Sequence, residues 1–195
     1  MTNLEEIFDD ARAKLEERLT QDRFLHSVST SEIAALMADV YGVNREHALL
    51  AGLLHDWDKA YSESELIERA QQFGVEIGED PLKLLSLLHA QTGACAVAEE
   101  YPGLPQEITQ AIARHTSAAT NMTPLDMLVY VADLIEPLRT ASSIDRLRRL
   151  AGNIPLEELF ILCYRNTMEH LILRKRYLHP NTAEIWNTYA AINPG

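Results

Sequence analysis

Four histidines and two aspartates lie in stretches of the sequence that are otherwise apolar. The most informative pair is His55-Asp56, which directly follows the apolar run Ala-Gly-Leu-Leu. An ionisable group buried in such surroundings costs several kcal/mol unless it has a partner. A metal ion is an efficient partner for an adjacent imidazole and carboxylate. The dipeptide alone is weak evidence, because a chain with seven histidines contains one by chance fairly often.

The other four candidates lie on four further segments with helical periodicity. His26 follows Phe24-Leu25, His89 follows a leucine-rich run, His115 ends the pattern of Ile108 and Ile112, and Asp133 lies within Leu-Val-Tyr-Val-Ala-Asp-Leu-Ile. Alone, each histidine is more often a hydrogen-bonded core residue, and each aspartate a capping or ion-paired one. Together the six residues are sufficient for two metal ions that share one bridging carboxylate.

The elements that must position these residues are helices. The spacing of apolar residues is helical along nearly the whole chain and predicts an all-α fold. Capping and stop signals place helices over residues 4–19, 22–42, 44–54, 62–74, 80–101 (starting at Asp80-Pro81), 105–115, 123–137, 143–151, 155–177 and 182–192. We expect a single domain over residues 1–195, with a core over about 22–140 and C-terminal helices over 143–192.

The composition limits the kinds of partner. The chain has 195 residues, with 17 basic and 29 acidic side chains and a formal net charge of −12. A protein that coats duplex nucleic acid needs an excess of Lys and Arg, so this balance argues against one. A small phosphorylated substrate remains compatible with it, because a bound metal supplies positive charge locally.

Cysteine usage and the chain ends indicate a cytoplasmic protein. Cys95 and Cys163 are far apart, and no CxxC pair exists, which excludes a zinc ribbon or a redox motif. Both are expected to be core thiols. The acidic N-terminus is unlike a secretory signal, and no apolar run is long enough for a membrane span.

The motifs also resemble a known family. The order His…His-Asp…Asp is the signature of the HD-domain metal-dependent phosphohydrolases. The resemblance to the YqeK family of HD-domain proteins spans roughly residues 22–190 and rests on the strings RFLHSVSTSEIAALM, HALLAGLLHDWDK, LLHAQTGACAVAEEY, AIARHTSAATNM and YVADLIEPLR. These relatives are symmetrical bis(5′-nucleosyl)-tetraphosphatases, which cut diadenosine tetraphosphate into two ADP. The resemblance implies an HD-domain helical bundle with a metal site between helices.

The resemblance also implies roles for the six candidates. His26, His55, Asp56 and Asp133 match the ligands of a first metal ion, and His89 and His115 match the extra histidines of the two-metal subset, with Asp56 as the bridge. Iron is the metal that it suggests, whereas ligand chemistry alone fits iron, manganese, zinc or nickel equally. The expected reaction is attack on a phosphoanhydride by a metal-bound hydroxide.

Several residues near the predicted metal centre are candidates for the reaction and for phosphate binding. Lys59 lies four residues after His55 and is expected, with Asp56, at the reacting phosphate; the alternative is a solvated helix-end cation. Arg139 is a second phosphate candidate, with an ion pair to Glu136 as its alternative. Thr116 is expected to contact the substrate. In the family this loop usually continues Thr-Gly, which is Ser117-Ala118 here, and glycine permits a positive φ that alanine resists.

Other residues have a more ordinary expected role. Arg114 is a weaker phosphate candidate. His170 is expected to pack in the core, and His179 has a small chance of lining the pocket. The basic run at residues 173–176 is expected to be a solvated helix face, with an anion or partner surface as the alternative. Trp57 is expected to pack in the core rather than stack on an adenine.

Four other functions remain open at this stage. The same metal site could serve an HD phosphodiesterase or nucleotidase acting on another nucleotide, or an HD oxygenase. The domain could bind nucleotides without turnover, or it could be a plain helical bundle with structural histidines. The expected partner is a dinucleoside polyphosphate or another nucleotide, and a homodimer is the candidate assembly.

Overall fold

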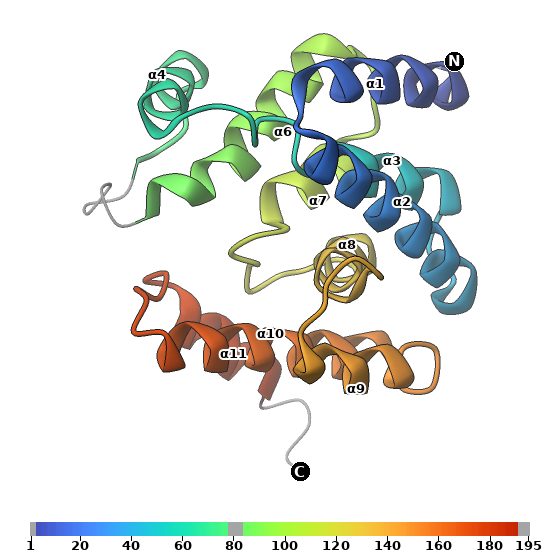
Figure 1. Cartoon of the computed structure of the whole chain (residues 1–195), viewed down its shortest axis with the longest axis vertical. Helices are drawn as coiled ribbons and strands as arrows, with labels where there is room; N and C mark the ends of the chain where they lie inside the picture. Colours follow the sequence, from blue (N-terminus) through green and yellow to red (C-terminus); the bar gives the residue numbers. More distant parts are fainter. Residues whose placement is uncertain (1–2, 78–83, 191–195) are drawn as a thin grey trace.

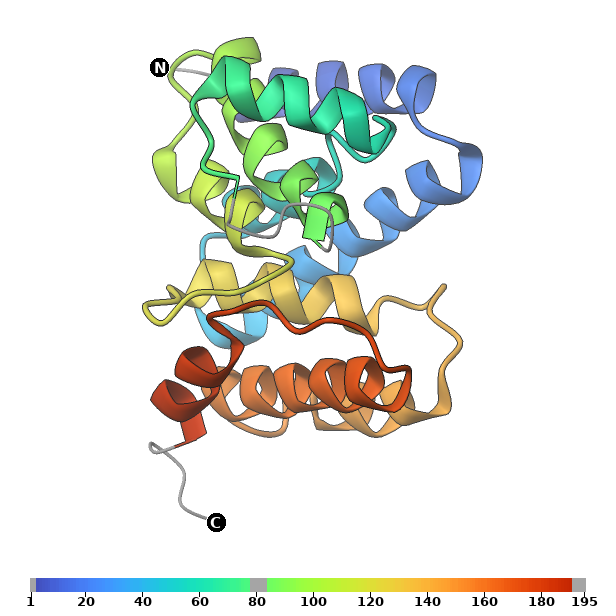
Figure 2. The same ribbon diagram turned by 90° about the vertical axis from the view of Figure 1, so that its left-hand side faces the viewer.

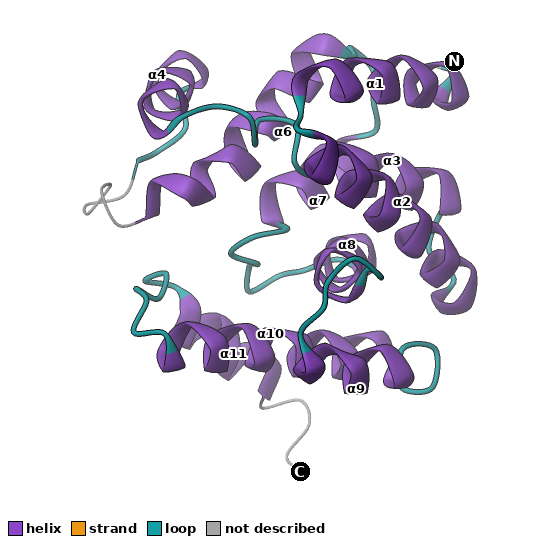
Figure 3. Cartoon of the chain, in the orientation of Figure 1, coloured by secondary structure: helices purple, strands orange, loops and turns teal. Residues whose placement is uncertain are grey.

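The computed structural model describes residues 3–77 and 84–190, and all of its regular elements are helical (Figure 3). They are α1 (Leu4–Arg18), α2 (Gln21–Tyr41), α3 (Arg45–Leu54), α4 (Glu63–Phe73), the 3-10 turn η1 (Leu85–Leu87), α6 (Leu88–Glu100), α7 (Gln106–Arg114), α8 (Pro124–Ile135), α9 (Ser142–Leu150), α10 (Leu156–Leu173) and α11 (Thr182–Ala190). The described ranges contain no strand, which confirms the predicted all-α class. Within them, no helix is long and apolar enough to cross a membrane.

Capping residues fix several of the helix boundaries where the sequence predicts them. The Asn44 side chain accepts a hydrogen bond from the His47 amide at the start of α3. Ser62 and Glu65 form a capping box on α4, and Thr123 forms another on α8. Gly42 ends α2 in the left-handed conformation, which a side chain would resist.

Two predicted helices differ from the structure. The proposed start at Asp80-Pro81 lies outside the described residues; from Leu84 the chain makes the turn η1 before α6 begins at Leu88. The helix predicted to reach Tyr177 ends at Leu173. There Lys175 is left-handed, with φ of +53°, and the Lys175 and Arg176 amides bond back to the carbonyls of Ile172 and Leu171. This pattern is a Schellman motif with lysine in the place usually taken by glycine, so no glycine marked the end.

Helix α8 is the centre of the arrangement. Figures 1 and 2 show it between a group formed by α1–α7 and a layer formed by α9–α11. It packs against α2, α3, α7, α9 and α10. Nearly all of its residues are buried, as expected for a helix that is apolar on every face.

Cys163, on α10, is buried as predicted, whereas Cys95 is only half-buried.

The close packing of α2 on α3 depends on Gly52. A Cβ atom at this position would lie 2.8 Å from the Ser31 Cα and 3.1 Å from the Thr30 carbonyl oxygen. The Ser31 hydroxyl donates a hydrogen bond to the Leu49 carbonyl across the same contact, at 2.7 Å. Glycine therefore lets the two backbones touch, next to the end of α3 that carries His55.

We expect Gly52→Ala to destabilise the protein by about 1–3 kcal/mol, because the added methyl group would force α2 and α3 apart. At this chain length, that corresponds to a fall in melting temperature of about 2–4 °C per kcal/mol. Gly93→Ala is the matched control. Its Cβ would meet nothing closer than 3.4 Å, so the better helix propensity of alanine should leave stability equal or slightly higher. Equal melting temperatures for both variants would contradict the packing argument.

Candidate metal centre

The six predicted ligand side chains lie together in one cluster. His26 comes from α2, His89 from α6 and Asp133 from α8. His55 and Asp56 are the two residues that follow α3, and His115 is the residue that follows α7. Five of the six are buried, and the sixth, Asp133, keeps 22% of its side chain exposed. Residues that are up to 107 positions apart thus meet at the junction of five helices.

The Asp56 carboxylate lies between two pairs of histidines. Its Oδ2 atom is 3.5 Å from the His55 Nε2 atom and 4.0 Å from the His26 Nε2 atom. Its Oδ1 atom is 3.1 Å from the His89 Nε2 atom and 3.8 Å from the His115 Nε2 atom. Within each pair, the two Nε2 atoms are 3.2 Å apart. Each oxygen of one carboxylate therefore faces its own pair of imidazoles.

Asp133 completes the first of these two sets. Its Oδ1 atom lies 2.9 Å from the His26 Nε2 atom and 3.9 Å from the His55 Nε2 atom. One set then offers two imidazoles and two carboxylates, and the other offers two imidazoles and the shared Asp56. Either set could hold a divalent cation, because nitrogen and oxygen donors of this kind suit iron, manganese, zinc and nickel.

The other ring nitrogen of each histidine is already used. The Nδ1 atoms of His55, His89 and His115 lie 2.7, 2.5 and 2.7 Å from the backbone carbonyl oxygens three residues earlier, those of Gly52, Ser86 and Ile112. A carbonyl can only accept a hydrogen bond, so Nδ1 carries the hydrogen and the Nε2 lone pair points into the cluster. This orientation is typical of metal-binding histidines.

Glu136 orients His26 in the same way, and the sequence analysis considered it only as a partner of Arg139. Its buried carboxylate lies 3.0 Å from the His26 Nδ1 atom and also accepts from the Leu138 amide. The available signal was its position three residues after Asp133, which places both side chains on one face at the end of α8.

Burial and the neighbouring groups shift the pKa values of the clustered side chains in different directions. Burial, together with the nearby rings of His55 and His89, lowers the pKa of His115 to about 3 and keeps it neutral. Burial would raise the pKa of Asp56, but the surrounding imidazoles outweigh it and hold that pKa well below its ordinary value. Burial likewise opposes charging of His55, yet the Asp56 carboxylate raises the pKa of His55. Converging lone pairs around ionised carboxylates are the chemistry of a cation site.

Three basic side chains border the cluster, and we call Arg23, Lys59 and Arg139 the cationic rim. Arg23 Nη1 lies 3.2 Å from Asp56 Oδ2, and Arg139 Nη2 lies 2.6 Å from Asp133 Oδ1. Lys59 Nζ lies 3.3 Å from His89 Nε2 and 4.0 Å from Asp56 Oδ1. All three side chains are partly exposed, so the rim lies on the solvent side of the cluster.

The structure adds to what the sequence predicts for the rim. Arg139 has the ion pair with Glu136 that was weighed for it, at 3.9 Å, but its closer partner is Asp133. Arg23 was missed altogether, although its place three residues before His26 puts both on one face of α2.

Burial lowers the pKa of Lys59; the Asp56 carboxylate opposes this effect and the Arg23 guanidinium adds to it.

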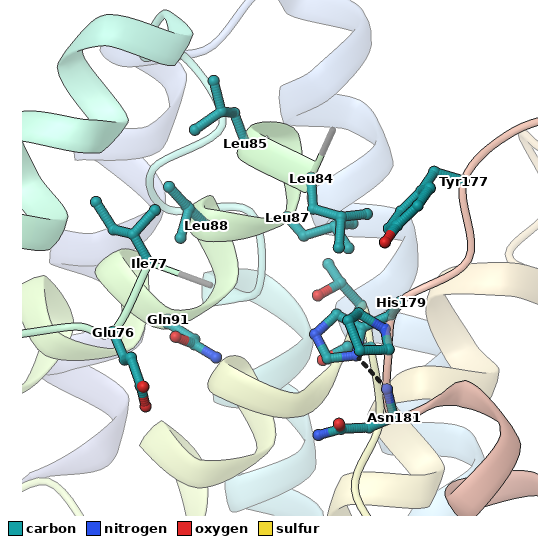
Figure 4. Close-up of a pocket in the computed structure, with 13 residues that line it drawn as sticks. Glu76, Ile77, Leu84, Leu85, Leu87, Leu88, Gln91, Tyr177, His179 and Asn181 are labelled. Atoms are coloured by element: carbon teal, nitrogen blue, oxygen red, sulfur yellow. Dashed lines mark hydrogen bonds between the residues drawn. The ribbon is translucent and has the colours of Figure 1, made fainter. Parts of the chain in front are cut away.

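Figure 4 shows a cleft of about 870 Å³. Its lining includes residues of the leucine-rich segment over 84–88, residues of the chain over 177–181, and Thr116. None of the six clustered side chains lines it, but Thr116 directly follows His115 and Leu88 directly precedes His89. His179 lines this cleft, a role that the sequence analysis considered for it, and accepts a hydrogen bond from the Asn181 amide.

The loop after His115 shows why the family pattern matters. Ala118 has a φ of +60°, in the left-handed region where the resemblance expects glycine. A left-handed alanine costs roughly 1–2 kcal/mol relative to the right-handed form. The backbone course that brings Thr116 to the cleft is thus kept despite the substitution.

Three other candidates lie away from the cluster or differ from expectation. Arg114 donates to the Asp126 carboxylate at 2.7 Å, an ion pair that explains it without phosphate. Trp57 is buried and packs edge-on against Tyr101, as predicted. The expected core packing of His170 is wrong: its side chain is exposed near the end of α10.

Comparison with known proteins agrees with this geometry. The family model for the HD domain matches residues 23–138. The symmetrical bis(5′-nucleosyl)-tetraphosphatase of Bacillus subtilis is 31% identical over 92% of this chain and 95% of its own, and the Staphylococcus aureus protein of the same name is 30% identical over 93% of each. A crystal structure from Clostridium acetobutylicum, described as a predicted HD superfamily hydrolase involved in NAD metabolism, has a TM-score of 0.89 and 29% identity, covering 95% of this chain and 98% of its own.

The segment that carries His55 and Asp56 is held by a buried ion pair that the sequence analysis did not find. Asp58 is fully buried, and both of its oxygens accept from Arg69 of α4, at 2.7 and 3.0 Å. Arg18 approaches the same carboxylate to 3.8 Å. The pair ties α4 to the backbone between Asp56 and Lys59.

Arg69→Ala should lower the free energy of unfolding by about 3–5 kcal/mol, because it leaves the Asp58 charge buried without its main partner. Denaturant titration followed by circular dichroism measures this loss. Arg165→Ala, which removes an exposed pair with Glu169 on α10, should cost less than about 0.5 kcal/mol. A loss below about 1 kcal/mol for Arg69→Ala would show that the pair does not hold this segment.

Proposed function

This chain belongs to the HD domain family and, within it, to the family of the symmetrical bis(5′-nucleosyl)-tetraphosphatases, and from that membership we propose that it hydrolyses diadenosine tetraphosphate to two ADP. The observation that supports this most directly is the position of Asp56. One carboxylate faces two pairs of histidines, and all four rings have Nδ1 bonded elsewhere. Such an arrangement suits two cations side by side, the usual means of binding a phosphoanhydride for displacement.

We assign the six side chains to two ions. His26, His55, Asp56 and Asp133 would hold the first ion, and Asp56, His89 and His115 the second, with Asp56 shared between them. Iron is our first choice, and manganese, zinc and nickel fit the same donors. When bound, the ions would supply hydroxide from water at neutral pH and positive charge for the phosphates.

The cationic rim would bind the phosphates. The three rim side chains pair with the cluster's own carboxylates, and a substrate phosphate is a competing anion for Lys59 and Arg139. Lys59 is close to the second histidine pair and Arg139 to the first, so they would contact the phosphates on either side. The Thr116 hydroxyl, on the cleft wall beside His115, is a further donor.

The reaction itself needs little covalent chemistry from the chain. Water adds to one of the two central phosphorus atoms, and the central P–O–P bridge breaks. One ADP takes the hydroxyl group, the other keeps the bridging oxygen, which carries the developing negative charge, and the remaining proton of the water passes to solvent. Lys59 and Arg139 would offset this charge and so lower the barrier in the transition state more than in the ground state.

The first test measures metal content and products on one sample of untagged protein. We expect about two ions per chain and ADP as the sole product from diadenosine tetraphosphate. AMP with ATP would overturn the symmetrical cleavage. Bound metal without these products would overturn the substrate, and NAD, other nucleotides and oxygen consumption would then be assayed. Tight nucleotide binding without turnover would indicate a binding module. No metal after supplying iron or manganese would overturn the whole assignment.

Two variants on the same side of the cluster separate metal binding from phosphate binding. His89→Ala should bind one ion per chain in place of two and lose more than about 100-fold in kcat, as expected when a metal is lost. Lys59→Ala should keep both ions and lose about 10- to 100-fold in kcat/KM, the effect of one charged contact to phosphate. Metal analysis and steady-state kinetics give both numbers. Full metal content in His89→Ala, or unchanged kinetics in Lys59→Ala, would contradict the respective role.

A further inference from the structure

A second cavity, of about 490 Å³, lies beside the cleft of Figure 4, and we call it the distal cavity. It is lined by α8, α10 and the chain over residues 174–182. Six residues line both spaces: Leu84, Leu87, Thr116, Ser117, Tyr177 and His179. The cleft and the distal cavity are therefore neighbouring parts of one groove.

One end of the distal cavity borders the metal cluster. Its wall includes Ser86, whose carbonyl oxygen accepts from the His89 Nδ1 atom. It also includes Thr116, which follows His115, and Tyr130, which lies about one helical turn before Asp133 on α8. The wall thus contains close neighbours of ligands from both sets.

The other end is basic. Arg174 and Arg176 line the distal cavity, and no Asp or Glu among the described residues does. Neither arginine has an acidic partner within the described part of the chain, although the chain carries a net charge of −12. Left without carboxylates, two guanidinium groups at one cavity form a site for an external anion, and phosphate is the anion that their forked donors match best.

The backbone holds the two arginines in place. The Schellman motif that ends α10 turns the chain at Lys175, so that Arg174 and Arg176 line the cavity while Lys175 does not. The basic run at residues 173–176 is exposed, as expected, but beyond Leu173 it forms a turn beside a cavity and not a helix face.

The spacing fits an elongated ligand. The Tyr130 hydroxyl donates to the Thr167 hydroxyl at 3.2 Å and so fixes α8 against α10. Both helices end on the same side of the molecule (Figure 2). Asp133 is three residues beyond Tyr130, a rise of about 4.5 Å, and Arg174 is seven residues beyond Thr167, a rise of about 10 Å in the same direction, so the two differ by about 6 Å along the helices. A ligand with phosphate at the metal cluster would also have to cross from α8 to α10 to reach the arginines.

We propose that Arg174 and Arg176 form an anion subsite for one nucleoside diphosphate half of a dinucleoside polyphosphate, while the larger cleft takes the other half. The inference rests on the proposed function and specifies its substrate class. A two-headed nucleotide contacts both ends of the groove at once, whereas a mononucleotide contacts one. The subsite would therefore favour dinucleoside polyphosphates over nucleotides with a single nucleoside.

The test compares Arg174→Ala/Arg176→Ala with Lys175→Ala, which removes a charge from the same turn without changing the cavity wall. The probe is diadenosine tetraphosphate with a methylene group in place of the central bridging oxygen, so that binding is measured without cleavage at that bond. We expect the double variant to bind the probe about 10- to 100-fold more weakly and to raise KM similarly, with metal content unchanged. ADP binding to the double variant and all values for Lys175→Ala should stay within about threefold of the original chain.

The outcomes separate the subsite from the reaction. Unchanged probe binding in the double variant, with normal hydrolysis by the original chain, would overturn the subsite and leave the proposed function standing. Arginine-dependent probe binding without hydrolysis would support the subsite and overturn the reaction. No probe binding by the original chain would overturn both. Arg174→Gln/Arg176→Gln keeps the polar stems and replaces the double alanine variant if that one fails to fold.

Discussion

The Asp56 carboxylate between two pairs of imidazoles is the constraint on which the rest of the structure depends. Four Nε2 lone pairs and two carboxylates converge in a buried space, and without a cation they would repel one another. Such an arrangement is stable only if the surrounding helices are fixed before the cation binds. The Nδ1 hydrogen bonds to carbonyl oxygens are part of that fixation, since they hold three of the rings through their own backbone turns.

The packing of the helices serves this constraint at several points. Gly52 lets α2 and α3 touch beside His55, and the Asp58–Arg69 pair fixes the chain between Asp56 and Lys59. Helix α8 carries Asp133 and lies in the middle of the fold, where helices of both groups pack against it. The polar cluster thus lies in the buried interior, where close packing restricts side-chain positions.

The cluster could be predicted from sequence because each of its members is a polar residue within an apolar pattern, which is a local signal. Its supporting residues could not, because Glu136, Arg23 and Asp58 acquire their meaning only from long-range contacts. A glutamate and an arginine near a helix end are ordinary on sequence grounds. The end of α10 was misplaced for another reason. Lys175 adopts the left-handed conformation that ends the helix, and a lysine, unlike a glycine, does not mark such a position in the sequence. The fold class and the helix caps, which depend on neighbours in sequence, were predicted best.

The net charge of −12 would suggest weak binding of a polyanion, but the distribution of charged side chains around the groove is the relevant quantity. At physiological ionic strength, exposed charges are screened over about 8 Å, so carboxylates elsewhere on the surface hardly affect the groove. Arg23, Lys59 and Arg139 gather around the cluster, and Arg174 and Arg176 line the cavity beside it. If the groove binds a polyphosphate as proposed, the acidic surface elsewhere would repel the nucleotide, and the local basic residues would favour binding in the groove.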